Sequence, residues 1–148
     1  MLELVPVTAA CVMQAASIQQ VPPQIILGLL KTEGGRVGME SPNRGKDGKA
    51  FSYDLGPMQV NDRVWVPVVA DMHFGGDHAA ARRALRDHGC YNVHIGAWIY
   101  RQYVDEAKGD LAEAVGYYNS HTPSKKRAYQ RRFSENFMQL FGGAGKGG

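Results

Sequence analysis

Residues 22–35 read Pro-Pro-Gln-Ile-Ile-Leu-Gly-Leu-Leu-Lys-Thr-Glu-Gly-Gly, and this stretch decides how the fold is interpreted. Its two prolines suit the first turn of a helix. A stripe with helical spacing follows, made of Ile26, Leu29, Leu30 and Glu33. Gly34 and Gly35 then end the helix and open a loop. Glu33 is therefore predicted to end a helix and to share its face with leucines.

The apolar surroundings expected for Glu33 favour acid catalysis. Desolvation disfavours the charged form of a carboxyl group, so we expect the pKa of Glu33 to be raised and its proton to be available for donation. The alternative is that Glu33 lies in water at a frayed helix end, which is the common situation for a glutamate next to two glycines.

Length and composition indicate one domain over residues 1–141, followed by a flexible glycine-rich tail, residues 142–148. The chain has 148 residues, 44% of them apolar, and a formal net charge of +3. It contains no helix-turn-helix, zinc-finger or base-stacking motif, so nucleic-acid binding is not indicated. No apolar run is long enough for a membrane span, so stable membrane insertion is not expected. Residues 1–16 contain Glu3 and lack a positively charged start, so no signal peptide is visible.

The remaining periodicity is helical except in one central stretch. Helices are expected over residues 8–17 and 22–33, and a third is expected to start after Asn61-Asp62. Four more are expected: residues 79–87, capped by Asp77; residues 92–109, ended by Gly109; a helix that starts at Asp110; and residues 124–141. The third helix is expected to contain Pro67, either in its first turn or at a kink. Residues 34–54 are expected to be irregular, with a short hairpin around Asp47-Gly48 and residues 51–53. The expected fold class is mostly α.

The last two helices have clear predicted faces. After Asp110, which has capping-box spacing to Glu113, the expected inward face comprises Leu111, Ala114, Val115 and Tyr118. In the last helix the expected apolar side comprises Tyr129, Phe133, Phe137, Leu140 and Phe141. Its basic residues are expected mostly outside, either as a solvated face or as a contact for peptide carboxylates or a protein partner. They are Lys125, Lys126, Arg127, Arg131 and Arg132.

Five short motifs occur in a fixed order along the chain. They are Glu33, Ser52-Tyr53-Asp54-Leu55-Gly56, Gly56-Pro57-Met58-Gln59-Val60-Asn61, Cys90-Tyr91-Asn92-Val93-His94-Ile95-Gly96-Ala97-Trp98 and Tyr117-Tyr118-Asn119. Together with Cys11, they resemble the family 1 lytic transglycosylases, which have a goose-lysozyme-like fold and cleave peptidoglycan. The resemblance covers residues 11–141 and is strongest to the small members that accompany type III secretion, type IV secretion and pilus machines.

The resemblance implies cleavage of the β-1,4 bond between N-acetylmuramic acid and N-acetylglucosamine, with formation of a 1,6-anhydromuramyl end. Glu33 would be the catalytic acid and base, with no metal or cofactor. The implied substrate-binding residues are Ser52, Met58, Gln59, Asn61, Tyr118 and Asn119. Met58 could instead pack in the core, and Tyr118, expected to hydrogen-bond Glu33, could be an ordinary core tyrosine. A periplasmic monomer acting on glycan strands, with a secretion, conjugation or pilus machine as partner, is expected.

The chain departs from the family pattern at three positions. Gly34, Pro57 and Tyr117 stand where the family usually has Ser, Leu and Ala. A glycan-binding protein that does not cut is therefore one alternative. Another is a muramidase that uses Asp47 or Asp54 as a second carboxyl group, although both aspartates suit turns equally well.

Two further groups of residues have open alternatives. Cys11 and Cys90 are either buried free thiols or a disulfide, and the resemblance implies the disulfide. The cluster Asp71, His73, Asp77 and His78 could suggest a metal site, but its spacing matches no zinc motif, and a loop leading into a helix explains it better.

Overall fold

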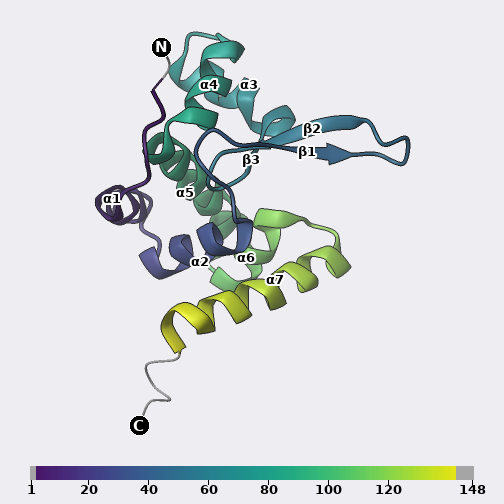
Figure 1. Ribbon diagram of the computed structural model, residues 1–148. Helices are drawn as coiled ribbons and strands as arrows, with labels where there is room; N and C mark the ends of the chain where they lie inside the picture. Colours follow the sequence, from purple (N-terminus) through teal and green to yellow (C-terminus); the bar gives the residue numbers. More distant parts are fainter. Residues whose placement is uncertain (1–2, 143–148) are drawn as a thin grey trace. The chain divides into compact units, whose positions relative to one another are not determined.

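The computed structural model describes residues 3–142 and is mostly helical, as expected (Figure 1). Its elements are α1 (Ala9–Gln19), α2 (Pro23–Glu33), β1 (Glu40–Arg44), β2 (Ala50–Leu55), β3 (Val60–Asn61), α3 (Asp62–His73), α4 (His78–Asp87), α5 (Gly89–Glu106), α6 (Leu111–Asn119), α7 (Pro123–Phe137) and a terminal π-helical turn η1 (Met138–Gly142). Apart from Gly142, the predicted flexible tail lies outside the described residues.

The described chain forms two compact units. Unit 1 comprises residues 3–11 and 33–96, and unit 2 comprises residues 12–32 and 97–142. Unit 1 contains the sheet, α3, α4 and the start of α5, whereas unit 2 contains most of α1 and α2, the end of α5, and the last two helices. None of the helices within residues 3–142 is both long and apolar enough to cross a membrane.

The sheet in unit 1 is larger than the sequence suggested. β1 and β2 pair antiparallel from Glu40 opposite Leu55 to Arg44 opposite Ala50, and β3 pairs with the end of β2 (Figure 1). The hairpin around Asp47-Gly48 is thus confirmed, but residues 40–44 are a strand and not the irregular segment we expected. β1 reads Glu-Ser-Pro-Asn-Arg, without apolar residues at alternate positions, so its strand character has no hydrophobic signature.

Capping side chains set the helix starts in unit 1. Asn61 Oδ1 accepts a hydrogen bond from Val64 N (3.2 Å), and Asp77 Oδ1 accepts one from Ala80 N (3.0 Å), so α4 begins one residue before the predicted position. Pro67 lies inside α3, beyond its first turn.

A disulfide joins α1 to the first turn of α5. Cys11 and Cys90 are bonded, with their Cα atoms 5.7 Å apart, as the family resemblance implied. Thr8 lies beside the bond, and its hydroxyl accepts a hydrogen bond from Cys11 N (3.1 Å). The start of α5 is therefore tied covalently to the start of α1.

Unit 2 is held together by close helix packing. A Cβ atom on Gly28 of α2 would lie 2.6 Å from the Phe133 ring of α7, so these helices approach at a position where only glycine fits. Asn136 donates a hydrogen bond to the Thr32 hydroxyl (3.0 Å), and Gln130 donates one to the Ala112 carbonyl (2.8 Å). These contacts fix α2 and α6 on α7.

Two predicted apolar faces in unit 2 are partly wrong. Ala114, Val115 and Tyr129 are buried as expected, but Leu111 is 37% exposed because it occupies the first position of α6, at the edge of the packed helices. Leu140 and Phe141 are 44% and 38% exposed. The α-helical pattern ends at Phe137, and the π turn that follows changes the spacing of the side chains, so the stripe does not continue.

Candidate active site

Glu33 is the last residue of α2 and is half-buried. Ile26 and Leu29 of the same predicted stripe are completely buried, which confirms the apolar face of the helix. Gly34 follows with φ of 65°, in the left-handed region that favours glycine. A serine, which the motifs of the lytic transglycosylases that this chain resembles usually have here, would be strained in this backbone conformation, so the departure at Gly34 matches the local structure.

Gly35 brings this helix end directly against the Gly56–Gln59 turn, which we define as residues 56–59. A Cβ atom on Gly35 would lie 2.8 Å from Gln59 Nε2 and 2.9 Å from the Pro57 carbonyl oxygen, and closer still to the Gly56 carbonyl oxygen. Such distances leave no room for a side chain, so the two backbone segments are in direct contact. The residue two positions after Glu33 therefore touches the side-chain amide of Gln59.

The Gly56–Gln59 turn has an unusual backbone at both ends. Gly56 has φ of 67°, and Gln59, with φ of 53°, is a non-glycine residue in the left-handed region. The Gln59 backbone N–H and its Nε2 both donate to the Gly56 carbonyl oxygen, at 3.0 and 2.9 Å. Such conformations persist only where surrounding structure imposes them, and they are common at functional sites.

Asn92 of α5 supplies that surrounding structure. Its Oδ1 accepts a hydrogen bond from Met58 N (2.8 Å), and its Nδ2 donates to the carbonyl oxygens of Leu55 (2.8 Å) and Leu85 (2.9 Å). Asn92 is completely buried, and its amide has a partner on each polar atom. Asn92 belongs to one of the five sequence motifs, but the sequence did not lead us to expect that it holds the Gly56–Gln59 turn. The signal that could have revealed it is a lone asparagine within the apolar stripe of a long helix.

Gly96 lies one helical turn after Asn92 and makes space for Met58. A Cβ atom on Gly96 would collide with the Met58 side chain, which is completely buried. This burial favours core packing of Met58 over direct contact with a substrate. Asn92 and Gly96 together explain why the motif has an Asn-x-x-x-Gly spacing, since positions i and i+4 lie on one face of the helix.

Ser52 and Asn61 are brought together on the sheet. Asn61 Nδ2 donates to Ser52 Oγ (3.1 Å) and to Asp54 Oδ1 (3.0 Å), while Asn43 Nδ2 also donates to Ser52 Oγ (3.0 Å). Ser52 is only 4% exposed. These two predicted substrate-binding residues therefore hydrogen-bond within the protein, joining β2 to the start of α3.

The two aspartates considered as a second acid have local roles. Asp47 is exposed in the hairpin turn, and its Oδ1 accepts a hydrogen bond from Lys49 N (2.9 Å). Asp54 lies in β2 and accepts from Asn61. The arrangement of Asp47 agrees with the turn interpretation, whereas Asp54 lies in a strand and not in the turn that was expected.

Tyr118 and Asn119 belong to unit 2, at the end of α6. Tyr118 is half-buried and Asn119 is exposed. The neighbouring Tyr117, where the family usually has Ala, stacks on His121 with ring centroids 4.3 Å apart, and Lys126 Nζ lies 5.5 Å from the Tyr117 ring centre. Tyr117 therefore packs within unit 2.

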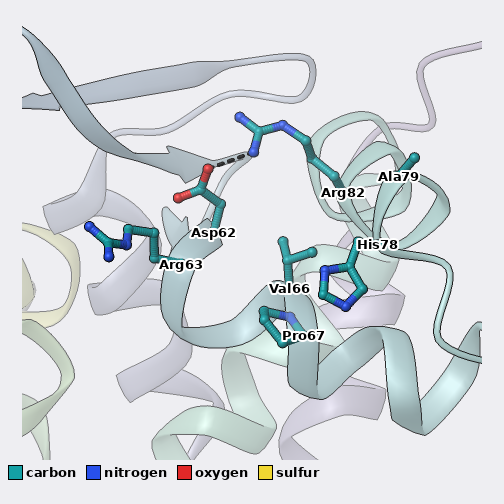
Figure 2. A pocket seen from close by; sticks show the side chains of 7 residues that line it. All are labelled: Asp62, Arg63, Val66, Pro67, His78, Ala79 and Arg82. Carbon is teal, nitrogen blue, oxygen red and sulfur yellow. Dashed lines mark hydrogen bonds and ion pairs between the residues drawn. The ribbon is translucent and has the colours of Figure 1, made fainter.

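A concavity in unit 1 lies between α3 and α4 (Figure 2). It has a volume of about 340 Å³ and is lined by Asp62, Arg63, Val66, Pro67, His78, Ala79 and Arg82. Arg82 Nη1 donates to Asp62 Oδ2 (2.5 Å), and Arg82 Nε donates to Glu40 (3.0 Å). Burial raises the pKa of Asp62, but hydrogen bonds from Tyr53 N and Arg82, with the charge of Arg82, outweigh burial and lower that pKa.

Within residues 3–142, no group of three or more His, Cys, Asp or Glu side chains is arranged to hold a metal ion. His73 Nδ1 instead hydrogen-bonds Tyr91 Oη (2.6 Å), and Asp77 caps α4. The loop-and-helix explanation of the Asp71 to His78 cluster therefore has direct structural support.

The arrangement combines one half-buried carboxyl group, at a helix end, with a turn whose glutamine amide packs against Gly35, two residues after that carboxyl group. A single carboxyl group can donate and accept a proton in turn, and an amide can hydrogen-bond a sugar hydroxyl or acetamido group. No protein-family model matches the chain, and no curated protein sequence matches it significantly.

Proposed function

We propose that this protein is a peptidoglycan lytic transglycosylase in which Glu33 is the only catalytic carboxyl group. The observation that supports this proposal most strongly is the direct packing of Gly35 on the Gly56–Gln59 turn. The Glu33 motif and the Gly56–Gln59 turn, which are far apart in the sequence, meet there. The Asn92 motif of α5 holds the turn in place. A chance combination of motifs would give no reason for such contacts.

The proposed reaction exchanges one bond at the anomeric carbon for another. The Glu33 carboxyl group donates its proton to the glycosidic oxygen, and the bond from that oxygen to C1 of N-acetylmuramic acid breaks. The 6-hydroxyl of the same sugar then forms a bond to C1 and gives its proton to the Glu33 carboxylate. The enzyme returns to its starting protonation state, no water is consumed, and a 1,6-anhydromuramyl end remains.

The residues near Glu33 have separate proposed roles. Gln59 Oε1 accepts a hydrogen bond from the sugar beside the cleaved bond, since its Nε2 already donates to the Gly56 carbonyl oxygen. Asn92 and Gly96 act as positioning residues because they hold the turn that presents Gln59. For Tyr118 and Asn119, which belong to unit 2, the proposed roles come from the motif resemblance alone: orientation of the catalytic carboxyl group for Tyr118, and support of the adjoining backbone or a sugar for Asn119. Met58, Ser52 and Asn61 support the turn and the sheet rather than touching the glycan, because their polar or apolar surfaces are used internally.

The proposed setting is the periplasm, where local cleavage of glycan strands would open the cell wall for a secretion, conjugation or pilus machine. The disulfide between Cys11 and Cys90 is compatible with an oxidising compartment. A cofactor is not needed for the proposed reaction, since proton transfer and ring closure involve only Glu33 and the substrate.

The test is mass spectrometry of muropeptides released from purified peptidoglycan by the wild type and by Glu33→Gln. Glutamine is nearly isosteric with glutamic acid but has no titrating proton. We expect anhydromuramyl fragments from the wild type and none from the variant. Gln24→Glu, at an exposed position in the first turn of α2, is a matched control that changes charge on the same helix and should leave release unchanged. Binding of peptidoglycan without any released fragment by the wild type would instead indicate a non-catalytic binding protein.

A further inference from the structure

We propose that α7 and the π turn η1 form a peripheral binding surface for an anionic lipid membrane. This lipid-facing surface is defined by four basic residues and three apolar ones: Lys125, Arg127, Arg131, Arg132, Met138, Leu140 and Phe141. It lies entirely within unit 2, does not include Glu33 and does not depend on the proposed catalytic function.

The positive charge of the protein is concentrated on α7. This helix contains five basic residues and one acidic residue, whereas the formal net charge of the whole chain is only +3, so the rest of the chain is close to neutral. Lys126 pairs with Glu113 of α6. The four basic residues of the lipid-facing surface are exposed, and within residues 3–142 none of them forms an ion pair.

The basic residues are distributed around the outer side of the helix. Arg127 and Arg131 lie on one flank, spaced four residues apart, and Lys125 and Arg132 lie on the other, spaced seven residues apart. Lys125 and Arg132 are four residues before and three residues after the buried Tyr129, so their flank borders the packed face of α7, and Arg132 Cζ lies 5.4 Å from the Tyr129 ring centre. A broad cationic face of this kind suits a flat layer of negative charge.

Exposed apolar side chains follow at the end of the same helix. Met138, Leu140 and Phe141 are 50%, 44% and 38% exposed, so the π turn presents three large apolar groups to solvent. Next to them lies an apolar groove of about 300 Å³, lined by α6, α7 and Ile25, which includes Phe137 and Met138. Ser134 lines this groove and also the basic depression around Arg127 and Arg131, so the apolar and cationic surfaces are continuous.

A lipid surface fits this combination better than an acidic protein or a nucleic acid does. Apolar side chains beside a cationic helix face are typical of helices that lie in the membrane interface, where the basic groups meet headgroups and the apolar groups enter the acyl region. A nucleic acid would use the charges but not Met138 and Leu140. An acidic protein would need a complementary fold, whereas a membrane accommodates protruding side chains of any arrangement.

The experiment measures binding of the full-length protein to vesicles by co-sedimentation. One set of vesicles contains phosphatidylcholine alone, and the other has phosphatidylglycerol as one lipid in three. We expect partitioning onto the anionic vesicles only, weakened by high salt. The double variant Arg127→Gln/Arg131→Gln should bind about 25-fold more weakly, since each cation near such a surface contributes about fivefold. Met138→Ser/Leu140→Ser should weaken binding roughly tenfold or more.

Matched controls come from the hairpin in unit 1. Lys46→Gln/Lys49→Gln removes the same charge from exposed positions, and Phe51→Ser removes a side chain that is 57% exposed. Both controls should bind like the wild type, and thermal unfolding should show that all variants are folded. Equal binding to neutral and anionic vesicles, no binding to either, or equal losses in the hairpin controls would overturn the proposal. The proposal would also be overturned if the Met138→Ser/Leu140→Ser variant bound anionic vesicles like the wild type and the wild type bound poly-glutamate or DNA equally well. General binding of polyanions would then explain the surface.

Discussion

Two turns of unit 1 have similar local conformations and opposite surroundings. Gly48 in the hairpin turn and Gly56 in the Gly56–Gln59 turn have φ of 77° and 67°. A Cβ atom on Gly48 would meet nothing within 4 Å, whereas one on Gly56 would lie 2.5 Å from the Leu85 carbonyl oxygen and 2.6 Å from Asn92 Nδ2. The hairpin turn is thus set by local backbone preference, and the turn beside Glu33 is set by tertiary contacts. This difference is what we expect where a protein must hold one conformation for function.

The largest effect of a single substitution is expected for Gly56→Ala compared with Gly48→Ala. Both changes place a side chain at a positive φ, which costs about 1 kcal/mol or slightly more. Only Gly56→Ala also forces a methyl group against backbone and a buried amide, which adds roughly 1 to 3 kcal/mol. Urea unfolding should therefore show a loss of about 2 to 4 kcal/mol for Gly56→Ala and about 1 kcal/mol for Gly48→Ala. Equal losses would mean that the two turns are held in the same way.

Loss of the disulfide should destabilise the Gly56–Gln59 turn and leave the hairpin turn at Gly48 unchanged. Cys90 lies two residues before Asn92, at the start of the helix that holds the Gly56–Gln59 turn. Closing a loop of this length contributes on the order of 4 kcal/mol in the chain-entropy model, and removing native disulfides costs about 2 to 5 kcal/mol.

Hydrogen exchange of the Cys11→Ser/Cys90→Ser variant tests this expectation. Protection of the Met58 N–H should fall strongly, while protection of the Gly48 N–H should not change. Labelling of both cysteines in the non-reduced wild type by an alkylating reagent would show that the disulfide does not form.

A smaller loss is expected for Asn92→Ala, with Asn43→Ala as its matched control. Asn92→Ala leaves one buried N–H and two buried carbonyl groups without their partner, which should cost about 3 kcal/mol. Asn43→Ala removes one hydrogen bond to Ser52 near the hairpin and should cost about 1 kcal/mol. Thermal unfolding measures both. A loss for Asn92→Ala no larger than that of the control would contradict the role assigned to Asn92.

The smallest effect concerns pH and the ion pair between Asp62 of α3 and Arg82 of α4. The pKa of Asp62 is lowered in the folded protein, so its carboxylate stabilises the fold above the unfolded pKa of about 4, and this contribution is lost as pH falls through the lower folded value. Acidification should therefore destabilise the wild type more than Asp62→Asn, by about 1 kcal/mol for a pair of this exposure. Urea midpoints between neutral and acidic pH test this difference, and parallel curves for the two proteins would refute it.

The sequence predicted the features that have local causes. Asp77 and Asp110 were recognised as helix caps because their hydrogen bonds reach only three residues ahead. The end of α2 at Glu33 followed from two glycines. In contrast, the strand over residues 40–44 has no apolar alternation, and the exposure of Leu140 results from a change to π-helical spacing after Phe137.

Two motifs of the candidate site were recognised in the sequence, but the contacts that support them were not. Glu33 and Gln59 were chosen from motifs, and the structure places the helix end that follows Glu33 against Gln59. Asn92 was not chosen because its role depends on three partners, of which the nearest in sequence is seven residues away. Its place in the apolar stripe of α5 could have indicated that it is buried, but no sequence periodicity identifies the partners of such non-local hydrogen bonds.

The most direct test of the single-carboxyl mechanism is digestion of peptidoglycan in water enriched in the heavy oxygen isotope, followed by mass spectrometry of the released fragments. If the muramyl 6-hydroxyl attacks C1, the new ends are anhydro sugars, each one water lighter than a reducing end, and they contain no heavy oxygen. Reducing ends that carry heavy oxygen would show that water is the nucleophile, and would contradict a transglycosylase that acts through Glu33 alone.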